Sequence, residues 1–268
     1  MIDIHTHILY GLDDGARSLE ESITMCQMAY RDGVRMMVAT PHTLNGVYRN
    51  DRSTILNKVE ELNEALLEFG IQNSEFGGEN TQSAIRNPQS AISFRVLPGA
   101  DVSFSSDIVR LFEGEEVGTL NDKGCYIMVE FPSQGIPYRA EEVLFQLMAR
   151  GVIPIISHPE RNLEIARKPE RYYEMIQRGC LGQVTAMSLT GGFGSGIRRV
   201  AEKLLASRLI HVIASDAHSV DGRPPVLSTA VRAAGKILGA EEAWKMVTEY
   251  PQAVLEGRRP SIPDPISP

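Results

Sequence analysis

The chain opens with Met1-Ile2-Asp3-Ile4-His5-Thr6-His7, where a short apolar run over residues 2–4 predicts a strand that leads directly into two histidines. Similar apolar runs predict further strands at residues 36–39, 126–129, 153–156, 181–184 and 212–214. Apolar residues at helical spacing predict helices between them, at residues 19–32, 51–69, 140–149, 170–178, 197–207 and 226–238. Apolar strands that alternate with helices indicate a parallel sheet covered by helices.

Two architectures fit this alternation, a closed or nearly closed α/β barrel and an open, doubly wound sheet. The number of strands favours the barrel, and no glycine-rich phosphate loop follows the first strand, as a doubly wound nucleotide-binding sheet would require. Residues 1–256 are therefore predicted to form one domain. Residues 72–93 are rich in Asn, Gln, Ser and Gly and predict a surface insertion, and residues 257–268 predict a proline-rich C-terminal tail.

Composition narrows the class of protein. With 43% hydrophobic and 23% charged residues among 268, the chain is typical of a globular protein rather than a collagen-like, disordered or membrane protein. The formal net charge of −7 argues against a general binder of nucleic acid or of lipid surfaces. The start carries no signal-peptide pattern, and three widely spaced cysteines do not form a disulfide framework, so we expect a cytoplasmic protein without membrane insertion.

Histidines and carboxylates gather where the predicted strands end. Five of the six histidines lie at such positions, and in a parallel barrel the carboxyl ends of the strands converge on the face that carries the active site. The residues that follow strands in this way are His5, His7, Asp14, His42, Glu130, His158, Asp216 and His218. His211 stands at the start of its strand and is expected to be structural.

The spacing of these residues favours metal ions. His5 and His7 are two residues apart and point to the same side of an extended segment, and Asp216 and His218 repeat that spacing. The set holds too many ligands for one ion, so we expect two or three divalent ions. Imidazole and carboxylate ligands without thiolate suit Mn²⁺, Fe or Zn²⁺, and the ligand set does not choose among them. We take Mn²⁺ as the first choice.

Two arginines follow these clusters. Arg161 lies three residues after His158 and Arg223 five residues after His218, so both are expected to clamp a phosphate; surface salt bridges are the alternative. The glycine-rich stretch 191–196 suggests a loop at the start of a helix, which by itself is weak support for phosphate contact.

Several motifs together resemble those of the PHP (polymerase and histidinol phosphatase) superfamily. More narrowly, residues 1–256 are similar to the metal-dependent tyrosine-protein phosphatases that are encoded with bacterial capsule and exopolysaccharide genes. The motifs are Met1-Ile2-Asp3-Ile4-His5-Thr6-His7, Gly11-Leu12-Asp13-Asp14-Gly15, Ala39-Thr40-Pro41-His42, Val129-Glu130-Phe131-Pro132, Ser157-His158-Pro159-Glu160-Arg161-Asn162, Gln183-Val184-Thr185-Ala186 and Ser215-Asp216-Ala217-His218.

The resemblance implies a distorted (β/α)₇ barrel of the PHP type, similar to a TIM barrel, with three metal ions. The first ion would take His5, His7 and Asp216, the second Glu130 and His158, and the third Asp14, His42 and His218. The family's bridging carboxylate is usually Glu after Pro-Gly-Ala, whereas here Pro98-Gly99-Ala100 is followed by Asp101, one methylene shorter. Arg161 and Arg223 match the phosphate-binding arginines of the family.

The implied reaction is direct hydrolysis of a phosphoric monoester, with a hydroxide that bridges two metal ions as the nucleophile. Tyrosinate, with a pKa of ~10, leaves more easily than an alkoxide, and a metal ion or the His42 region would assist it. A cysteine-based route is excluded, because the positions six residues after the three cysteines are Asp32, Phe131 and Ala186 rather than arginine.

The expected substrate is the phosphotyrosine-containing tail of a tyrosine kinase of capsular or exopolysaccharide biosynthesis. A small-molecule phosphatase of the same superfamily, acting on histidinol phosphate or a nucleotide, is one alternative. An inactive scaffold that binds phosphotyrosine is another, and the shorter Asp101 is its only support. A metal-dependent amidohydrolase is disfavoured because no strand ends in a candidate lysine for a carbamylated bridge.

Overall fold

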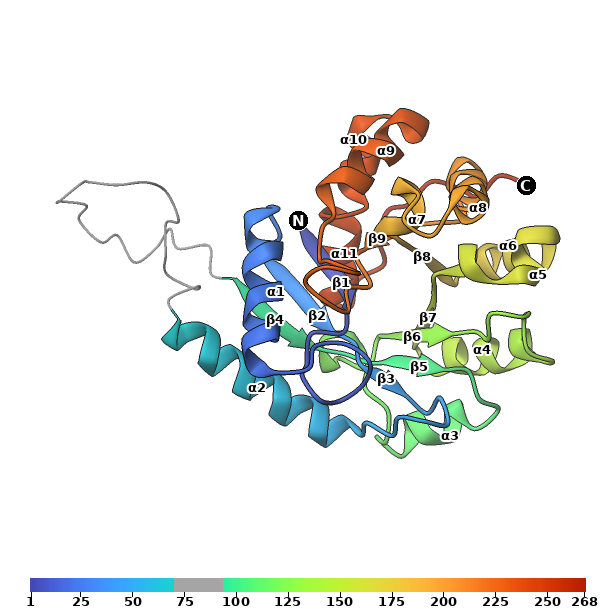
Figure 1. Ribbon diagram of the computed structural model, residues 1–268. Helices are drawn as coiled ribbons and strands as arrows, with labels where there is room; N and C mark the ends of the chain where they lie inside the picture. Colours follow the sequence, from blue (N-terminus) through green and yellow to red (C-terminus); the bar gives the residue numbers. More distant parts are fainter. Residues whose placement is uncertain (70–93) are drawn as a thin grey trace.

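The computed structural model describes residues 1–69 and 94–268, so the predicted insertion at residues 72–93 lies outside the described residues (Figure 1). The strands are β1 Ile2–Thr6, β2 Met36–Ala39, β3 His42–Thr43, β4 Arg95–Pro98, β5 Asp101–Ser103, β6 Tyr126–Glu130, β7 Ile153–Ser157, β8 Leu181–Thr185 and β9 Val212–Ala214. All seven pairings between these strands are parallel, which confirms the predicted parallel α/β class.

The strands form two sheets rather than one closed barrel. Three strands follow the order β1-β2-β4 and six follow the order β3-β5-β6-β7-β8-β9, and an isolated parallel bridge from Thr6 to Ala217 joins the end of β1 to the segment after β9. The ladder breaks at Thr40-Pro41, between β2 and β3, where proline cannot donate a backbone hydrogen bond, and at Gly99-Ala100, between β4 and β5. Neighbouring strands follow one another along the chain without the reversal of a doubly wound sheet.

Helices lie around the strands, on the outside of the molecule (Figure 1). The helices of four or more residues are α1 Leu19–Arg31, α2 Arg52–Glu68, α3 Ile108–Glu113, α4 Ala140–Ala149, α5 Leu163–Arg167, α6 Glu170–Gln177, α7 Ala186–Thr190, α8 Ser195–Ala206, α9 Ser228–Leu238, α10 Ala240–Lys245 and α11 Glu249–Leu255. The described residues also contain two 3₁₀ turns, η1 Leu120–Asp122 and η2 Pro159–Arg161. None of the helices in the described residues is both long and apolar enough to span a bilayer.

Local sequence explains where the longer helices begin and which face they bury. The side chain of Ser18 accepts a hydrogen bond from the backbone N–H of Glu21 at the start of α1, and Asp51 does the same for Thr54 at the start of α2. The predicted apolar face of α2 is buried, including Ile55. Burial of each such side chain stabilises the fold by about 1.5–3 kcal/mol.

Close packing at Gly99 positions one strand of the site, and the C-terminal segment covers the other end of the strands. A Cβ on Gly99 would lie 2.7 Å from Cγ1 of Val38 and 3.1 Å from Cγ2 of Thr40, so glycine lets the chain before β5 pass close to β2. At the opposite end of the strands, the C-terminal segment 258–268 has no regular secondary structure but lies against the protein. The hydroxyl of Tyr126 donates a hydrogen bond to the carbonyl of Arg258, and the backbone N–H of Ile266 donates one to the carbonyl of Ser207.

Candidate metal centre

The predicted ligands come together at the carboxyl ends of the strands. His5 lies on β1, His42 on β3, Asp101 on β5 and Glu130 at the end of β6, and the others lie in the loops that directly follow β1, β7 and β9. We refer to the nine predicted ligands as the strand-end cluster: His5, His7, Asp14, His42, Asp101, Glu130, His158, Asp216 and His218. Three groups of residues within the cluster are close enough to hold a metal ion.

The first group is His5, His7 and Asp216, the set expected for the first ion. The Nε2 atoms of the two histidines lie 3.2 Å apart, and they lie 3.5 and 3.4 Å from Oδ1 of Asp216. All three side chains are buried. Burial lowers the pKa of His5 to about 4, so its imidazole is neutral at neutral pH and offers a lone pair. Two buried imidazole nitrogens that face one carboxylate oxygen form a site suited to a divalent cation.

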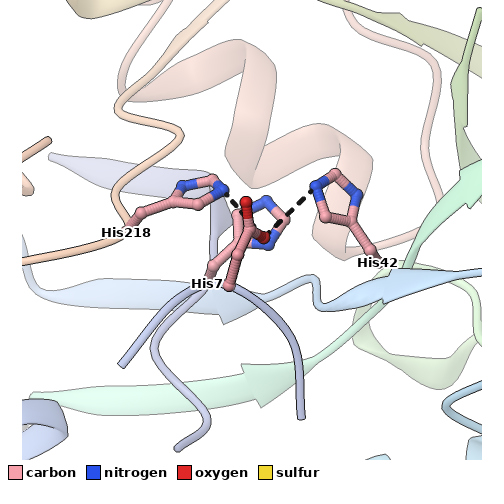
Figure 2. A group of neighbouring side chains, drawn as sticks. His7, His42 and His218 are labelled. Carbon is pink, nitrogen blue, oxygen red and sulfur yellow. Dashed lines mark ion pairs between the residues drawn. The ribbon is translucent and has the colours of Figure 1, made fainter. Parts of the chain in front are cut away.

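The second group is His7, Asp14, His42 and His218. It contains the set expected for the third ion together with His7. Oδ1 of Asp14 lies 3.7 Å from Nε2 of His42 and 3.5 Å from Nε2 of His218, and Figure 2 shows the three imidazoles converging on the carboxylate between them. Nε2 of His218 is buried and has no hydrogen-bond partner in the described part of the chain. This unpartnered nitrogen fits a ligand of a metal ion.

The third group is His42, Asp101 and Glu130. Nδ1 of His42 lies 3.5 Å from Oδ2 of Asp101 and 3.6 Å from Oε2 of Glu130. Nδ1 of His42 and Oδ2 of Asp101 are both buried without a hydrogen-bond partner among the described residues. Burial and the neighbouring Asp101 charge raise the pKa of Glu130, as expected for a buried carboxylate beside a second one.

His158 completes the cluster beside Glu130. Its Nε2 lies 3.4 Å from Oε1 of Glu130, so the two residues expected to share the second ion are neighbours. Asp101 is fully buried and also lies 3.6 Å from Nε2 of His5, where it stands between residues of the first and second groups. The hydroxyl of Ser157 donates a 2.5 Å hydrogen bond to Oδ1 of Asp101.

Two residues around the cluster were not assigned a role from the sequence. Oδ2 of Asp13 lies 2.6 Å from Nδ1 of His7 and accepts a 2.9 Å hydrogen bond from the backbone N–H of His42. Oε1 of Gln183, on β8, lies 3.0 Å from Nδ1 of His5 and accepts a hydrogen bond from the backbone N–H of His158. Such contacts orient metal-binding imidazoles. The sequence alone could have pointed to Gln183, because it is a polar residue within the largely apolar run that forms β8.

Backbone strain marks the same region. His158 has a φ of 31° and Asp216 a φ of 53°, both in the left-handed region that residues other than glycine rarely adopt. Strained backbone of this kind persists where the surrounding structure holds it and is typical of functional sites.

Both predicted phosphate-binding arginines reach into the cluster rather than lying in surface salt bridges. Nη2 of Arg223 lies 2.5 Å from Oδ2 of Asp216, and Nη2 of Arg161 also contacts that oxygen. Burial alone would raise the pKa of Asp216, but Arg161 and His5 outweigh it and hold that pKa well below its usual range. The Nε atoms of both arginines are buried and have no hydrogen-bond partner in the described residues. Two unpartnered cationic donors side by side fit an anion such as a phosphoryl group.

The fold and the strand-end cluster together define a parallel α/β protein with a candidate metal centre at the carboxyl ends of its strands. The chain belongs to the family described as capsular polysaccharide synthesis, CpsB/CapC, whose model matches residues 1–84 and 78–256.

Named relatives agree with this family. The chain is 34% identical over 258 residues to tyrosine-protein phosphatase YwqE of Bacillus subtilis (strain 168), covering 96% of this chain and 92% of that protein. It is 36% identical over 227 residues to the putative tyrosine-protein phosphatase CapC of Staphylococcus aureus, covering 85% and 80% of the two chains.

A solved structure shares the fold. It comes from work described as crystal structures of YwqE from Bacillus subtilis and CpsB from Streptococcus pneumoniae, unique metal-dependent tyrosine phosphatases. It matches with a TM-score of 0.88 at 33% identity and covers 100% of this chain and 99% of that chain.

Proposed function

We propose that this chain is a metal-dependent phosphoric monoester hydrolase that removes phosphate from tyrosine residues of proteins. The observation that carries the proposal is the pair Arg161 and Arg223, whose unpartnered Nε donors lie beside a cluster of imidazoles and carboxylates. The names of YwqE and CapC, tyrosine-protein phosphatase and putative tyrosine-protein phosphatase, support the same activity.

The substrate that we propose is the phosphotyrosine tail of a tyrosine kinase of capsular or exopolysaccharide biosynthesis, met in the cytoplasm. Membership of a capsular polysaccharide synthesis family supports the pathway.

The fold is proposed to be a distorted seven-stranded barrel of the PHP type. In it, β2 with β3 and β4 with β5 each count as one interrupted strand, since only two residues separate the members of each pair.

Three ions, with Mn²⁺ as the first choice, are proposed to occupy the cluster. His5, His7 and Asp216 would hold the first, Glu130 and His158 the second, and Asp14, His42 and His218 the third, with Asp101 shared between the first two. When bound, divalent ions supply a Lewis acid that neutralises phosphoryl oxygens and lowers the pKa of water.

The residues of the chain then divide the remaining tasks. Arg161 and Arg223 bind the phosphoryl oxygens with charged donors that are already in place, so little reorganisation is needed as charge develops. Asp216 holds both guanidinium groups on the side of the cluster. His42 lies at the edge of the cluster with 15% of its side chain exposed, and we propose that it assists the departing tyrosinate. The leaving oxygen need not be fully protonated as it departs, because the tyrosine hydroxyl has a pKa of only ~10.

The burial of Asp101 within the cluster supports its role as a ligand and favours an active enzyme over the scaffold alternative. A comparison of two substrates distinguishes a tyrosine-protein phosphatase from the remaining alternative, a small-molecule phosphatase. Purified protein with Mn²⁺ should release phosphate from a phosphotyrosine peptide with a kcat/KM well above that for histidinol phosphate. The opposite order would assign the chain to the small-molecule phosphatases of the superfamily.

A further inference from the structure

The aromatic ring of Phe193 lies next to both arginines of the proposed phosphate clamp. Cζ of Arg161 lies 5.3 Å from the centroid of the ring, and Cζ of Arg223 lies 5.7 Å from it. Both distances fall within the range of about 6 Å in which a cation is attracted to the face of an aromatic ring. Phe193 is partly buried, so this attraction is only partly screened by water.

The topology brings these three residues together from separate segments. Arg161 ends the turn η2 after β7, Phe193 lies in the loop between α7 and α8 that follows β8, and Arg223 lies in the loop after β9. Because β7, β8 and β9 are neighbours in the six-stranded sheet, the loop that carries Phe193 lies between the segments that carry the two arginines. Helix α8 also contacts η2, which anchors the loop on the side of Arg161.

The glycine-rich loop is built to present this ring. Gly191 and Gly194 flank Phe193 with φ values of 88° and 91°, which residues with a side chain rarely adopt. The chain therefore turns sharply on both sides of Phe193. This gives the glycine-rich stretch a role other than direct contact between its backbone and phosphate.

Two guanidinium groups that share one carboxylate oxygen repel each other. In the described residues the only carboxylate that pairs with either group is Asp216, which also belongs to the proposed set of the first ion. An aromatic face contacts both cations without competing for the Nε donors that the substrate would use.

We propose that Phe193 is a positioning residue that holds Arg161 and Arg223 in the geometry that binds the phosphoryl group. The proposal rests on the proposed phosphatase function only in taking a phosphoryl group as the ligand of the arginines. Phe193 acts through the two guanidinium groups and is not itself a catalytic residue.

Equilibrium binding of inorganic phosphate to the Mn²⁺-loaded protein, measured by calorimetry, tests the proposal without turnover. Phe193→Ala and Phe193→Leu should each weaken phosphate binding by about fivefold to tenfold, the effect of two cation–aromatic contacts. Phe193→Tyr should bind phosphate like the parent protein, because it keeps the aromatic face. Melting temperature and metal content should stay at the parental values in Phe193→Leu and Phe193→Tyr.

A double-mutant cycle shows whether the effect passes through the arginines. In an Arg161→Ala, Arg223→Ala background, Phe193→Leu should change phosphate binding by less than about twofold, because the coupled partners are gone. Parental binding by Phe193→Leu would show that the ring only fills space and would overturn the proposal. An equal loss in the background without arginines, or a parent protein that binds no phosphate, would overturn it as well.

The assay also keeps this proposal separate from the proposed function. If the parent protein binds phosphate and the Phe193 series behaves as expected, Phe193 positions the arginines even if phosphotyrosine peptides are not hydrolysed. In that case the proposed substrate is wrong and the positioning role stands.

Discussion

Oδ2 of Asp13 lies 2.6 Å from Nδ1 of His7 and holds the histidine with its Nε2 directed at His5 and Asp216. The same carboxylate oxygen accepts a hydrogen bond from the backbone N–H of His42, so one residue orients two proposed ligands. Burial alone would lower the pKa of His7, but the hydrogen bonds and charges of Asp13 and Asp216 outweigh burial and raise that pKa. A metal ion at Nε2 of His7 would benefit in the same way from the carboxylate behind the ring.

Replacement of Asp13 by Asn should therefore weaken metal binding. An amide removes the negative charge behind His7, and loss of such a supporting contact typically costs about tenfold to a hundredfold in metal affinity. Mn²⁺ titration of the chelated protein measures the change. Asp107→Asn is the matched control, because Asp107 is exposed and its side chain makes no capping hydrogen bond at the start of α3. Equal affinities in the two variants would mean that Asp13 has no part in the metal centre.

Arg161→Ala and Arg223→Ala should each lower kcat/KM for a phosphotyrosine peptide by about tenfold or more. This corresponds to a loss of ~1.4 kcal/mol or more of charged contact to the transition state. Metal content and melting temperature should hardly change. Arg199→Ala, on the exposed face of α8, serves as the control and should keep parental kinetics. Loss of metal or of folding in both the Arg161→Ala and Arg223→Ala variants would make the arginines structural.

Asp101→Ala should reduce both the number of bound metal ions and turnover, because Asp101 belongs to the third group and also lies 3.6 Å from Nε2 of His5 in the first group. A carboxylate that bridges two ions must reach cations about 3.5–4 Å apart. The close passage of Gly99 along β2 provides one route by which the shorter Asp side chain reaches that position. Metal analysis of Asp101→Ala beside Asp107→Ala decides the point, and an unchanged metal count with unchanged turnover would remove Asp101 from the ligand set.

His211 provides a pH test of the fold that is independent of the site. It is buried at the opposite end of β9, its Nδ1 accepts a hydrogen bond from the backbone N–H of Gly182, and burial lowers its pKa to about 4. In the unfolded chain the His211 imidazole has a pKa of ~6.5, so as the pH falls it is protonated there before it is protonated in the folded protein. The free energy of unfolding should thus lose ~1.4 kcal/mol per pH unit between about pH 6.5 and 4, with no contribution above pH 6.5.

The matched variant for this test is His211→Asn, which keeps an acceptor for the Gly182 N–H and cannot titrate. Denaturant unfolding of both proteins between pH 7.5 and 4.5 should show the parent losing stability relative to the variant as the pH falls. The other histidines titrate equally in both proteins. Parallel curves would contradict the assigned burial effect.

Much of the fold was predictable because its longer elements carry strong patterns. Strand β2 and helix α4 begin and end at the predicted residues, and β9 does as well. Strands β3, β4 and β5 were missed because runs of two to four residues show no clear periodicity. The resemblance implied a distorted seven-stranded barrel, and hydrogen bonding shows two parallel sheets that are interrupted near Pro41 and Gly99.

The site was predictable for a different reason, namely that parallel strands bring their carboxyl ends together. This rule placed His5, His158 and Asp216 without any knowledge of loop conformation. Asp101 followed only from the resemblance, since its short strand is not evident in the sequence. The roles of Asp13 and Phe193 depend on distances between loops, which no local pattern of residues encodes.

The central claim is that hydrolysis depends on metal ions and not on a thiol. Of the three cysteines, Cys26 and Cys180 are buried, and none has the arginine that a cysteine-based phosphate loop requires. The most direct test is phosphate release from a phosphotyrosine peptide after chelation, after addition of Mn²⁺ and after treatment with iodoacetamide. Chelation should abolish turnover, Mn²⁺ should restore it and iodoacetamide should leave it largely intact. Turnover that survives chelation and is lost on alkylation would contradict the account.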